Sequence, residues 1–184
     1  MSIVLSTLFF LVMLFMMSTI WTNSRGAPWV PTPREAVRRM LALAEVRPGE
    51  VVYDLGCGDG RVLLTAARRF GARAVGIEID VSRFLWSLAA VTACGLWGRV
   101  RLVRGDLFRQ DLSGADVVVT YLLQDTNDRL QDKLLRELRP GARVVSNTFS
   151  FSALSLAAVD EDYKLYLYKI GPASRPADRK ATGR

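Results

Sequence analysis

The chain has 184 residues, of which half are apolar and 23% are charged, and its formal net charge is +7. This composition fits one globular domain with a core of its own, flanked by extensions. The sequence contains no histidine, which excludes histidine general bases, histidine metal ligands and Ser-His-Asp triads. No metal site is predicted, and no nucleic-acid partner is expected, because no basic stripe is interleaved with aromatic residues.

The first predicted element is an apolar segment, residues 2–22, which carries no charged side chain. About 20 helical residues at a rise of about 1.5 Å each span about 30 Å, the thickness of the hydrocarbon core of a bilayer. A cleaved signal peptide and a buried core helix are the alternatives. However, no basic residue precedes the segment, and it has no polar face. The sequence therefore predicts one transmembrane helix at the amino terminus.

Basic residues on one side of this segment set its predicted orientation. Arg25, Arg34, Arg38 and Arg39 follow it closely, and none precedes it. The positive-inside rule places the rest of the chain on the cytoplasmic side, as in a single-pass membrane protein. The two cysteines form no CxxC motif, which fits a reducing compartment.

Changes in composition predict the boundaries of the domain. Residues 23–31 form a proline-containing linker, and residues 32–170 form the folded domain. Residues 171–184 form a basic tail without periodicity, which is expected to be disordered. This tail either contacts anionic lipid or serves only as a solubilising end.

A helix is predicted to open the domain. The residues Thr32-Pro33-Arg34-Glu35 match a capping box, with Thr32 at the N-cap and Glu35 at N3. The pair Pro48-Gly49 is expected to end this helix. Short apolar runs then alternate with amphipathic stretches to the end of the domain. Strands are predicted over residues 51–56, 72–80, 100–106, 115–123, 142–151 and 162–170, and helices over residues 61–70, 81–95 and 125–141.

Apolar strands separated by helices are typical of a parallel sheet that is covered on both faces. The predicted fold class is therefore α/β, with a Rossmann-like sheet. The last strand, residues 162–170, follows its predecessor with little or no helix between them and alternates apolar with polar residues. It is expected to pair antiparallel and to lie at an edge of the sheet.

The end of the first predicted strand carries the motif DLGCGDG, residues 54–60. Its glycines follow the spacing GxGxG, which differs from the GxGxxG of dinucleotide-binding folds, and the lysine of a P-loop is missing. Asp59 in this turn would repel a pyrophosphate, since two unit charges about 4 Å apart interact by about 4 kcal/mol at an effective dielectric constant near 20. A ligand with positive charge and no phosphate removes the conflict. S-adenosylmethionine is such a ligand.

Two further acids end the next two predicted strands: Glu78 ends the second and Asp106 the third. Ligands of open α/β sheets bind beyond the carboxyl ends of the strands. There, the carboxylate of Glu78 can accept both hydroxyls of a ribose. Asp106 and the backbone amides beside it can meet the edge of an adenine.

The motifs DLGCGDGR, GIEID and GDLF resemble the seven-strand (class I) S-adenosylmethionine-dependent methyltransferases over about residues 30–170. The resemblance implies a mostly parallel seven-strand sheet with an antiparallel C-terminal strand. It implies that the glycines let the methionine part of the cofactor approach the backbone, and that the acids of the first motif hold its ammonium. The acid after the second strand would bind the ribose, the Asp-Leu pair after the third strand the adenine, and two residues before the first helix would close over the cofactor. The cofactor-binding residues implied in this way are Pro31, Thr32, Asp54, Gly56, Gly58, Asp59, Gly60, Glu78, Asp106 and Leu107.

The residues after the fourth predicted strand bear on the substrate. Enzymes that methylate adenine amines or glutamine amides carry (Asn/Asp)-Pro-Pro-(Tyr/Phe) there, whereas this chain has TYLLQD, residues 120–125. Together, PWVPTPREAV, TYLL, PGARVVSNTF and YLYKI are similar to the membrane-anchored protein-lysine methyltransferases related to the enzymes for the adenine nucleotide translocase and the ATP synthase c-subunit. This resemblance implies a lysine acceptor on a protein in or near the membrane, with the bilayer bound through the N-terminal helix.

Methylation of lysine requires positioning and desolvation, because a lysine with a pKa of about 10.4 must first lose its proton. Tyr121 is predicted as a pocket wall and hydrogen-bond partner of the amine, and Asn147 is predicted to face the site from the fifth strand. Phe149 and Trp29 are expected to complete an aromatic enclosure, with core packing as the alternative for each. Two other functions stay open: methylation of a lipid, quinone or other small molecule, and a non-catalytic S-adenosylmethionine-binding membrane module.

Overall fold

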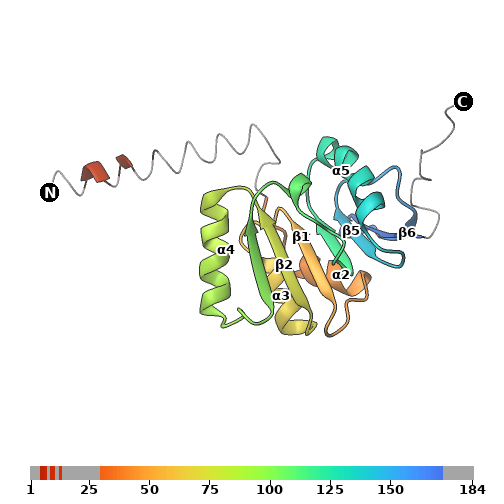
Figure 1. Cartoon of the computed structure of the whole chain (residues 1–184), viewed down its shortest axis with the longest axis horizontal. Helices are drawn as coiled ribbons and strands as arrows, with labels where there is room; N and C mark the ends of the chain where they lie inside the picture. Colours follow the sequence, from red (N-terminus) through yellow and green to blue (C-terminus); the bar gives the residue numbers. More distant parts are fainter. Residues whose placement is uncertain (1–4, 8, 11–12, 14–29, 172–184) are drawn as a thin grey trace, which may run out of the picture.

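The structure is a computed structural model, shown in Figure 1. The residues that it describes are 5–7, 9–10, 13 and 30–171. The elements of the folded domain run from helix α2 (Arg34–Leu43) to strand β7 (Leu165–Lys169). Most of the predicted linker and nearly all of the predicted tail lie outside the described residues.

The predicted N-terminal transmembrane helix is not shown by the described residues. Within the described parts of the chain, none of the helices has the length and the apolar character needed to span a bilayer. Such a span takes about 20 consecutive apolar residues in a helix. Of residues 2–22, the structure describes 5–7, 9–10 and 13, which are helical, and the others lie outside the described residues. By this finding, the predicted single-pass membrane location is wrong.

Within the described residues, seven strands form one sheet in the order β3-β2-β1-β4-β5-β7-β6. Strands β1 to β5 pair in parallel, and β7 pairs antiparallel with both β5 and β6. The strand order turns back between β1 and β4, which makes the carboxyl ends of these two strands the switch point where ligands of such sheets bind. The strands not yet bounded are β1 (Val51–Leu55), β2 (Arg73–Glu78), β3 (Val100–Arg104), β4 (Val117–Thr120), β5 (Arg143–Asn147) and β6 (Leu156–Asp160).

The antiparallel pairing of the last strand is confirmed, but its predicted position at the edge is wrong. Strand β7 lies between β5 and β6, and β6 takes the edge. The pattern of residues 152–161 did not predict the strand β6. Alternation along β7 suggested one solvated face, yet Leu165, Leu167 and Tyr168 are all buried. Both faces of β7 are therefore largely covered, as expected of an inner strand.

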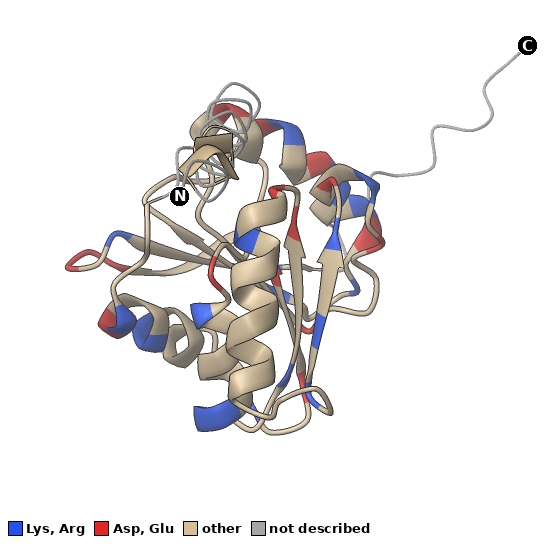
Figure 2. Ribbon diagram, turned by 90° about the vertical axis from the view of Figure 1, so that its left-hand side faces the viewer, with Lys and Arg blue, Asp and Glu red and all other residues tan. Residues whose placement is uncertain are grey.

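Helices cover both faces of the sheet (Figure 1). Helices α2, α3 (Arg61–Arg69) and α4 (Val81–Ala93) contribute to one hydrophobic cluster, and α5 (Gln124–Glu137) contributes to the cluster on the other face. Figure 2 shows α4 from outside, where the helix is almost free of charged residues. Among its exposed side chains are Leu85 and Trp86.

The predicted capping box does not form. Helix α2 begins at Arg34 with Pro33 as its N-cap, and no side chain makes a capping hydrogen bond. Glu35 instead pairs with Arg38, one turn along the helix. The helix also ends at Leu43, before the predicted stop.

Candidate functional site

A cavity of about 570 Å³ opens at the carboxyl ends of the strands around the switch point. Most of the predicted site residues line it. Gly60 and Asn147 do not, and neither does Phe149; Trp29 lies outside the described residues. The predicted residues that line the cavity are Pro31, Thr32, Asp54, Gly56, Gly58, Asp59, Glu78, Asp106, Leu107 and Tyr121.

The glycine turn after β1 forms one wall of this cavity. Gly56, Gly58 and Gly60 have φ values of +83°, +55° and +78°, a left-handed conformation that only glycine adopts without strain. The turn is fastened to the neighbouring strand because the amides of Gly56 and Cys57 donate to the carbonyl of Ile77 at 2.9 and 3.1 Å. Gly60 is the N-cap of α3 and shapes the turn rather than lining the cavity. The conformation explains the spacing of the motif.

Asp54, in β1, is a buried acid without a counter-charge. Its side chain is 5% exposed, and among the described residues the structure shows no hydrogen-bond donor to its carboxylate. Burial, together with the negative charges of Glu78 and Asp59, raises the pKa of Asp54 from 3.8 to about 8. A buried carboxylate of this kind favours a cationic ligand, because the cation supplies the missing opposite charge.

Glu78, the last residue of β2, is also buried, at 4% exposure. One carboxylate oxygen accepts from the amide of Gly58, and the other accepts from the amide of Asp80, each at 2.9 Å. These bonds fix the orientation of the carboxylate in the cavity wall. Each oxygen keeps a second acceptor site, so the group is pre-arranged for two donors such as ribose hydroxyls.

Asp59 differs from Asp54 because it is paired within the protein. The side chain of Arg61 donates from Nε to both of its oxygens, at 2.9 and 3.0 Å, and Nη2 also pairs with Oδ2. Burial acts to raise the pKa of Asp59, but the hydrogen bonds and charge of Arg61 outweigh it and hold the pKa below its ordinary value. Arg61 also donates from Nη1 to the carbonyl of Thr32 at 2.5 Å.

The residues after β3 form the opposite wall. Asp106 caps the short 3-10 helix η1 (Leu107–Arg109) by accepting from the amide of Phe108 at 2.9 Å. The guanidinium of Arg129, from α5, lies over the ring of Phe108 at 4.5 Å from its centroid. This cation–π contact joins the walls built by η1 and α5.

Tyr121, the residue directly after β4, lines the cavity. Asn147 is instead 6% exposed at the end of β5, where its side-chain oxygen accepts from the hydroxyl of Thr148 at 3.0 Å. In α5, the side-chain amide of Asn127 donates to the hydroxyl of Ser146 at 3.1 Å, while its oxygen Oδ1 is buried without a partner among the described residues.

Several residues of the cavity were not predicted from the sequence. The side chains of Arg61, Arg83 and Arg129 line the cavity together with Phe108 and Thr126. Arg61 directly follows the glycine motif in the sequence, so this position could have predicted that Arg61 lies at the cavity. Arg83 and Arg129 lie on separate helices, and only the fold brings them to the cavity.

The geometry fits S-adenosylmethionine. A buried carboxylate without a donor among the described residues, a second acid held by backbone amides, and a glycine turn open to close approach all lie at one switch point. The cofactor carries an ammonium, a sulfonium and a ribose, which match these groups in charge and hydrogen bonding. A seven-strand sheet with such a site defines the class of S-adenosylmethionine-dependent methyltransferases.

Comparisons with known proteins agree with this class. The family model described as the ANTKMT methyltransferase domain matches residues 54–157. A protein-lysine N-methyltransferase of Saccharolobus islandicus (strain REY15A) is 44% identical over 151 residues, which cover 78% of this chain and 94% of the relative. The mouse adenine nucleotide translocase lysine N-methyltransferase is 38% identical over 135 residues, covering 72% of this chain but 57% of the relative.

A solved structure extends the comparison. It is titled as an RNA methyltransferase from Salinibacter ruber in complex with S-adenosyl-L-homocysteine. Its sequence is 41% identical, its TM-score is 0.75, and the match covers 78% of this chain and 95% of that one.

The chain belongs to the ANTKMT methyltransferase family, whose relatives here include protein-lysine methyltransferases. The expected enzyme class and cofactor are confirmed: the protein is a methyltransferase that uses S-adenosylmethionine. The roles of individual residues in the cavity remain predictions.

Proposed function

We propose that the protein transfers a methyl group from S-adenosylmethionine to the ε-amine of a lysine in a protein substrate. The observation that carries the proposal is the 44% identity to a protein-lysine N-methyltransferase of which the match covers 94%. The match extends over nearly the whole of that relative, so it bears on the reaction as well as on the fold.

The cofactor supplies a methyl group on a sulfonium. When bound, it would give this methyl carbon to the lysine nitrogen, the electron pair of the carbon–sulfur bond would stay with sulfur, and the amine proton would leave to solvent. The protein contributes positioning and exclusion of water. No general base of the histidine type is needed if desolvation and the nearby positive charge lower the pKa of the lysine.

We assign the residues of the cavity to parts of this reaction. Asp54 holds the ammonium of the cofactor, because it is the buried acid to which no described residue donates a hydrogen bond. Glu78 accepts the ribose hydroxyls through the free acceptor sites of its oriented carboxylate. Asp106 and Leu107 meet the adenine at the opposite wall, and Tyr121 bounds the space for the substrate amine.

A membrane-associated protein is the substrate class that we propose to test first. One relative is named for the adenine nucleotide translocase, and the match to it covers 57% of that relative, so its substrate is offered here as a guide. RNA is the competing class, because the similar solved structure is titled as an RNA methyltransferase.

The test uses the full chain, tritiated S-adenosylmethionine, and separate protein, RNA and lipid fractions from cells that lack the gene. Asp54→Ala serves as the inactive control. Label in protein that protease removes and mass spectrometry places on lysine is the expected result. Label confined to the RNA fraction or to the organic extract would show that the substrate is RNA or a lipid and not a protein lysine.

A further inference from the structure

The side chain of Arg61 joins two parts of the chain that are distant in sequence. At one end, its Nε reaches both oxygens of Asp59, at 2.9 and 3.0 Å. At the other end, its Nη1 donates to the carbonyl of Thr32 at 2.5 Å. The guanidinium is planar and presents its donors in a fixed fork, so it can hold both partners at once.

The segment held by Arg61 forms a wall of the cofactor cavity. Val30, Pro31 and Thr32 all line the cavity. Helix α2 begins only at Arg34 and lacks a side-chain cap, so local structure does not fix the segment before it. Val30 is 54% exposed, whereas Thr32 is 8% exposed at the point where Arg61 contacts its carbonyl. The contact from Arg61 therefore ties this wall to the glycine turn.

The same contact occupies Asp59. Both oxygens of its carboxylate accept from Arg61, and the amide of Arg61 donates to Oδ1 at 3.2 Å. A carboxylate neutralised in this way offers little to a further cation. Asp54, a few residues earlier, has no such partner among the described residues.

We propose that Asp59 and Arg61 are a positioning pair that fastens residues 30–32 across the cofactor cavity, and that Asp59 does not hold the ammonium of the cofactor. The inference rests on the proposed use of the cavity by the cofactor but not on a lysine substrate. A binding measurement with the cofactor product can therefore test it without any methylation assay.

The variant Arg61→Gln distinguishes a positioning role of Asp59 from a role in binding the ammonium, because the two roles predict opposite changes in the affinity for S-adenosylhomocysteine. If the pair positions the wall, binding of S-adenosylhomocysteine weakens by about tenfold or more, the change expected for one charge-assisted hydrogen bond. If Asp59 holds the ammonium, the freed carboxylate leaves the affinity unchanged or makes it tighter. Titration calorimetry of the full chain measures this, and the second result overturns the proposal.

Two further variants distinguish positioning from charge and from folding. Arg61→Lys keeps the positive charge beside Asp59 but cannot span to Thr32, so affinity is expected to stay low. If Arg61→Lys instead binds S-adenosylhomocysteine as tightly as the unaltered protein, Arg61 acts only by neutralising the charge of Asp59. Arg69→Gln, on the exposed side of the same helix, is the matched control and is expected to bind like the unaltered protein.

Hydrogen exchange gives an independent readout in the same proteins. Arg61→Gln is expected to speed exchange of the amides near Thr32 while the core strands keep their protection. The double variant with Asp59→Asn is expected to bind no more weakly than Arg61→Gln alone, because the two residues act as one unit. Additive losses, or unchanged exchange near Thr32, would contradict the proposed fastening.

Discussion

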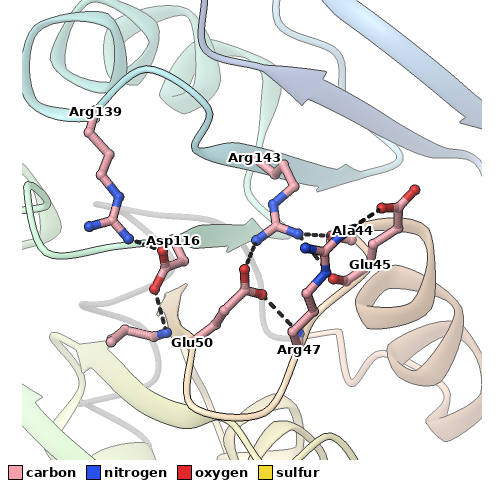
Figure 3. A network of polar contacts seen from close by, with 8 residues as sticks. Ala44, Glu45, Arg47, Glu50, Asp116, Arg139 and Arg143 are labelled. Carbon is pink, nitrogen blue, oxygen red and sulfur yellow. Dashed lines mark hydrogen bonds and ion pairs between the residues drawn. The ribbon is translucent and has the colours of Figure 1, made fainter.

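At the amino-terminal end of the strands, charged side chains pair with one another, whereas at the carboxyl-terminal end several acids face a cavity. Figure 3 shows the paired end. Arg143 donates to Glu50 at 2.5 Å and to the carbonyls of Ala44 and Glu45 at 2.7 and 3.0 Å. Asp116 accepts from the amide of Val51 at 2.9 Å and also pairs with Arg139.

The opposite end contains a buried carboxylate, Asp54, that is near two other acids and has no donor among the described residues. A buried ionisable group without a partner is costly to ionise, and such groups persist where function requires them. The comparison therefore assigns stability to the network around Arg143 and ligand binding to the acids around Asp54. Substitutions around Arg143 are therefore expected to change the free energy of unfolding, and substitutions around Asp54 are expected to change the affinity for the cofactor.

The largest expected effect is on cofactor binding. Asp54→Asn removes the carboxylate that faces the cation, so the affinity for S-adenosylhomocysteine is expected to fall by about 100-fold or more, given about 4 kcal/mol for a close charge pair at an effective dielectric constant near 20. Titration calorimetry measures the loss. Asp111→Asn, at an acid that does not line the cavity, is the control. Unchanged affinity in the Asp54 variant would remove Asp54 from the site.

The pH dependence follows from the raised pKa of Asp54. Since that pKa moves from 3.8 to about 8, the folded protein retains a proton that the unfolded chain has lost. The free energy of unfolding due to this group therefore falls as the pH rises from about 4 to about 8 and is constant above that range.

Cofactor binding is expected to release this proton, because a bound cation lowers the pKa of Asp54. Below pH 8, each unit by which the pH increases is then expected to raise the affinity for the cofactor by up to about tenfold. Calorimetry at pH 7 in two buffers of different ionisation enthalpy measures the release. The Asp54→Asn variant should show none, and an equal release in that variant would place the proton on another group.

At the amino-terminal end, Arg143→Ala is expected to lower the free energy of unfolding by about 2–3 kcal/mol, because the hydrogen bonds of a charged group are lost. Glu50 then loses its ion-pair partner, although it still accepts from the amide of Arg47. The side chains of Arg143 and Glu50 are only 13% and 21% exposed. Cofactor affinity should not change. Denaturant unfolding measures stability, with Arg101→Ala on exposed β3 as control; a loss of affinity without a loss of stability would reverse the assignment of the two ends.

The smallest expected effect is on the packing of helix α3 and the glycine turn against strand β2. A Cβ at Gly76 would lie 2.4 Å from Cδ1 of Leu63 and 2.8 Å from Sγ of Cys57, so Gly76→Ala is expected to cost about 1–2 kcal/mol through overpacking. Gly98→Ala is the matched control, because nothing lies within 4 Å of its Cβ position. Thermal unfolding compares the two, and equal midpoints would show that α3 shifts without strain.

The sequence predicted most of the fold because its strands are apolar runs separated by amphipathic stretches, a pattern that depends on local order alone. It also predicted the cavity acids, because carboxyl ends of parallel strands meet at one edge. It failed at β6, whose residues are mostly exposed, and at the edge position of β7, because strand order depends on pairing between distant segments. The capping box failed because the helix begins one residue later than predicted, which makes Pro33 the N-cap in place of Thr32.

By itself, the sequence determined the glycine turn and the acids at the strand ends, since backbone conformation and charge are properties of single residues at fixed spacing. Only the tertiary structure decided which acid is free for a ligand. Asp54 and Asp59 look equivalent in the motif, yet burial leaves one without a donor among the described residues while Arg61 neutralises the other. That distinction arises from three-dimensional contacts, because solvent exclusion and the reach of a guanidinium depend on what the fold packs around each carboxylate.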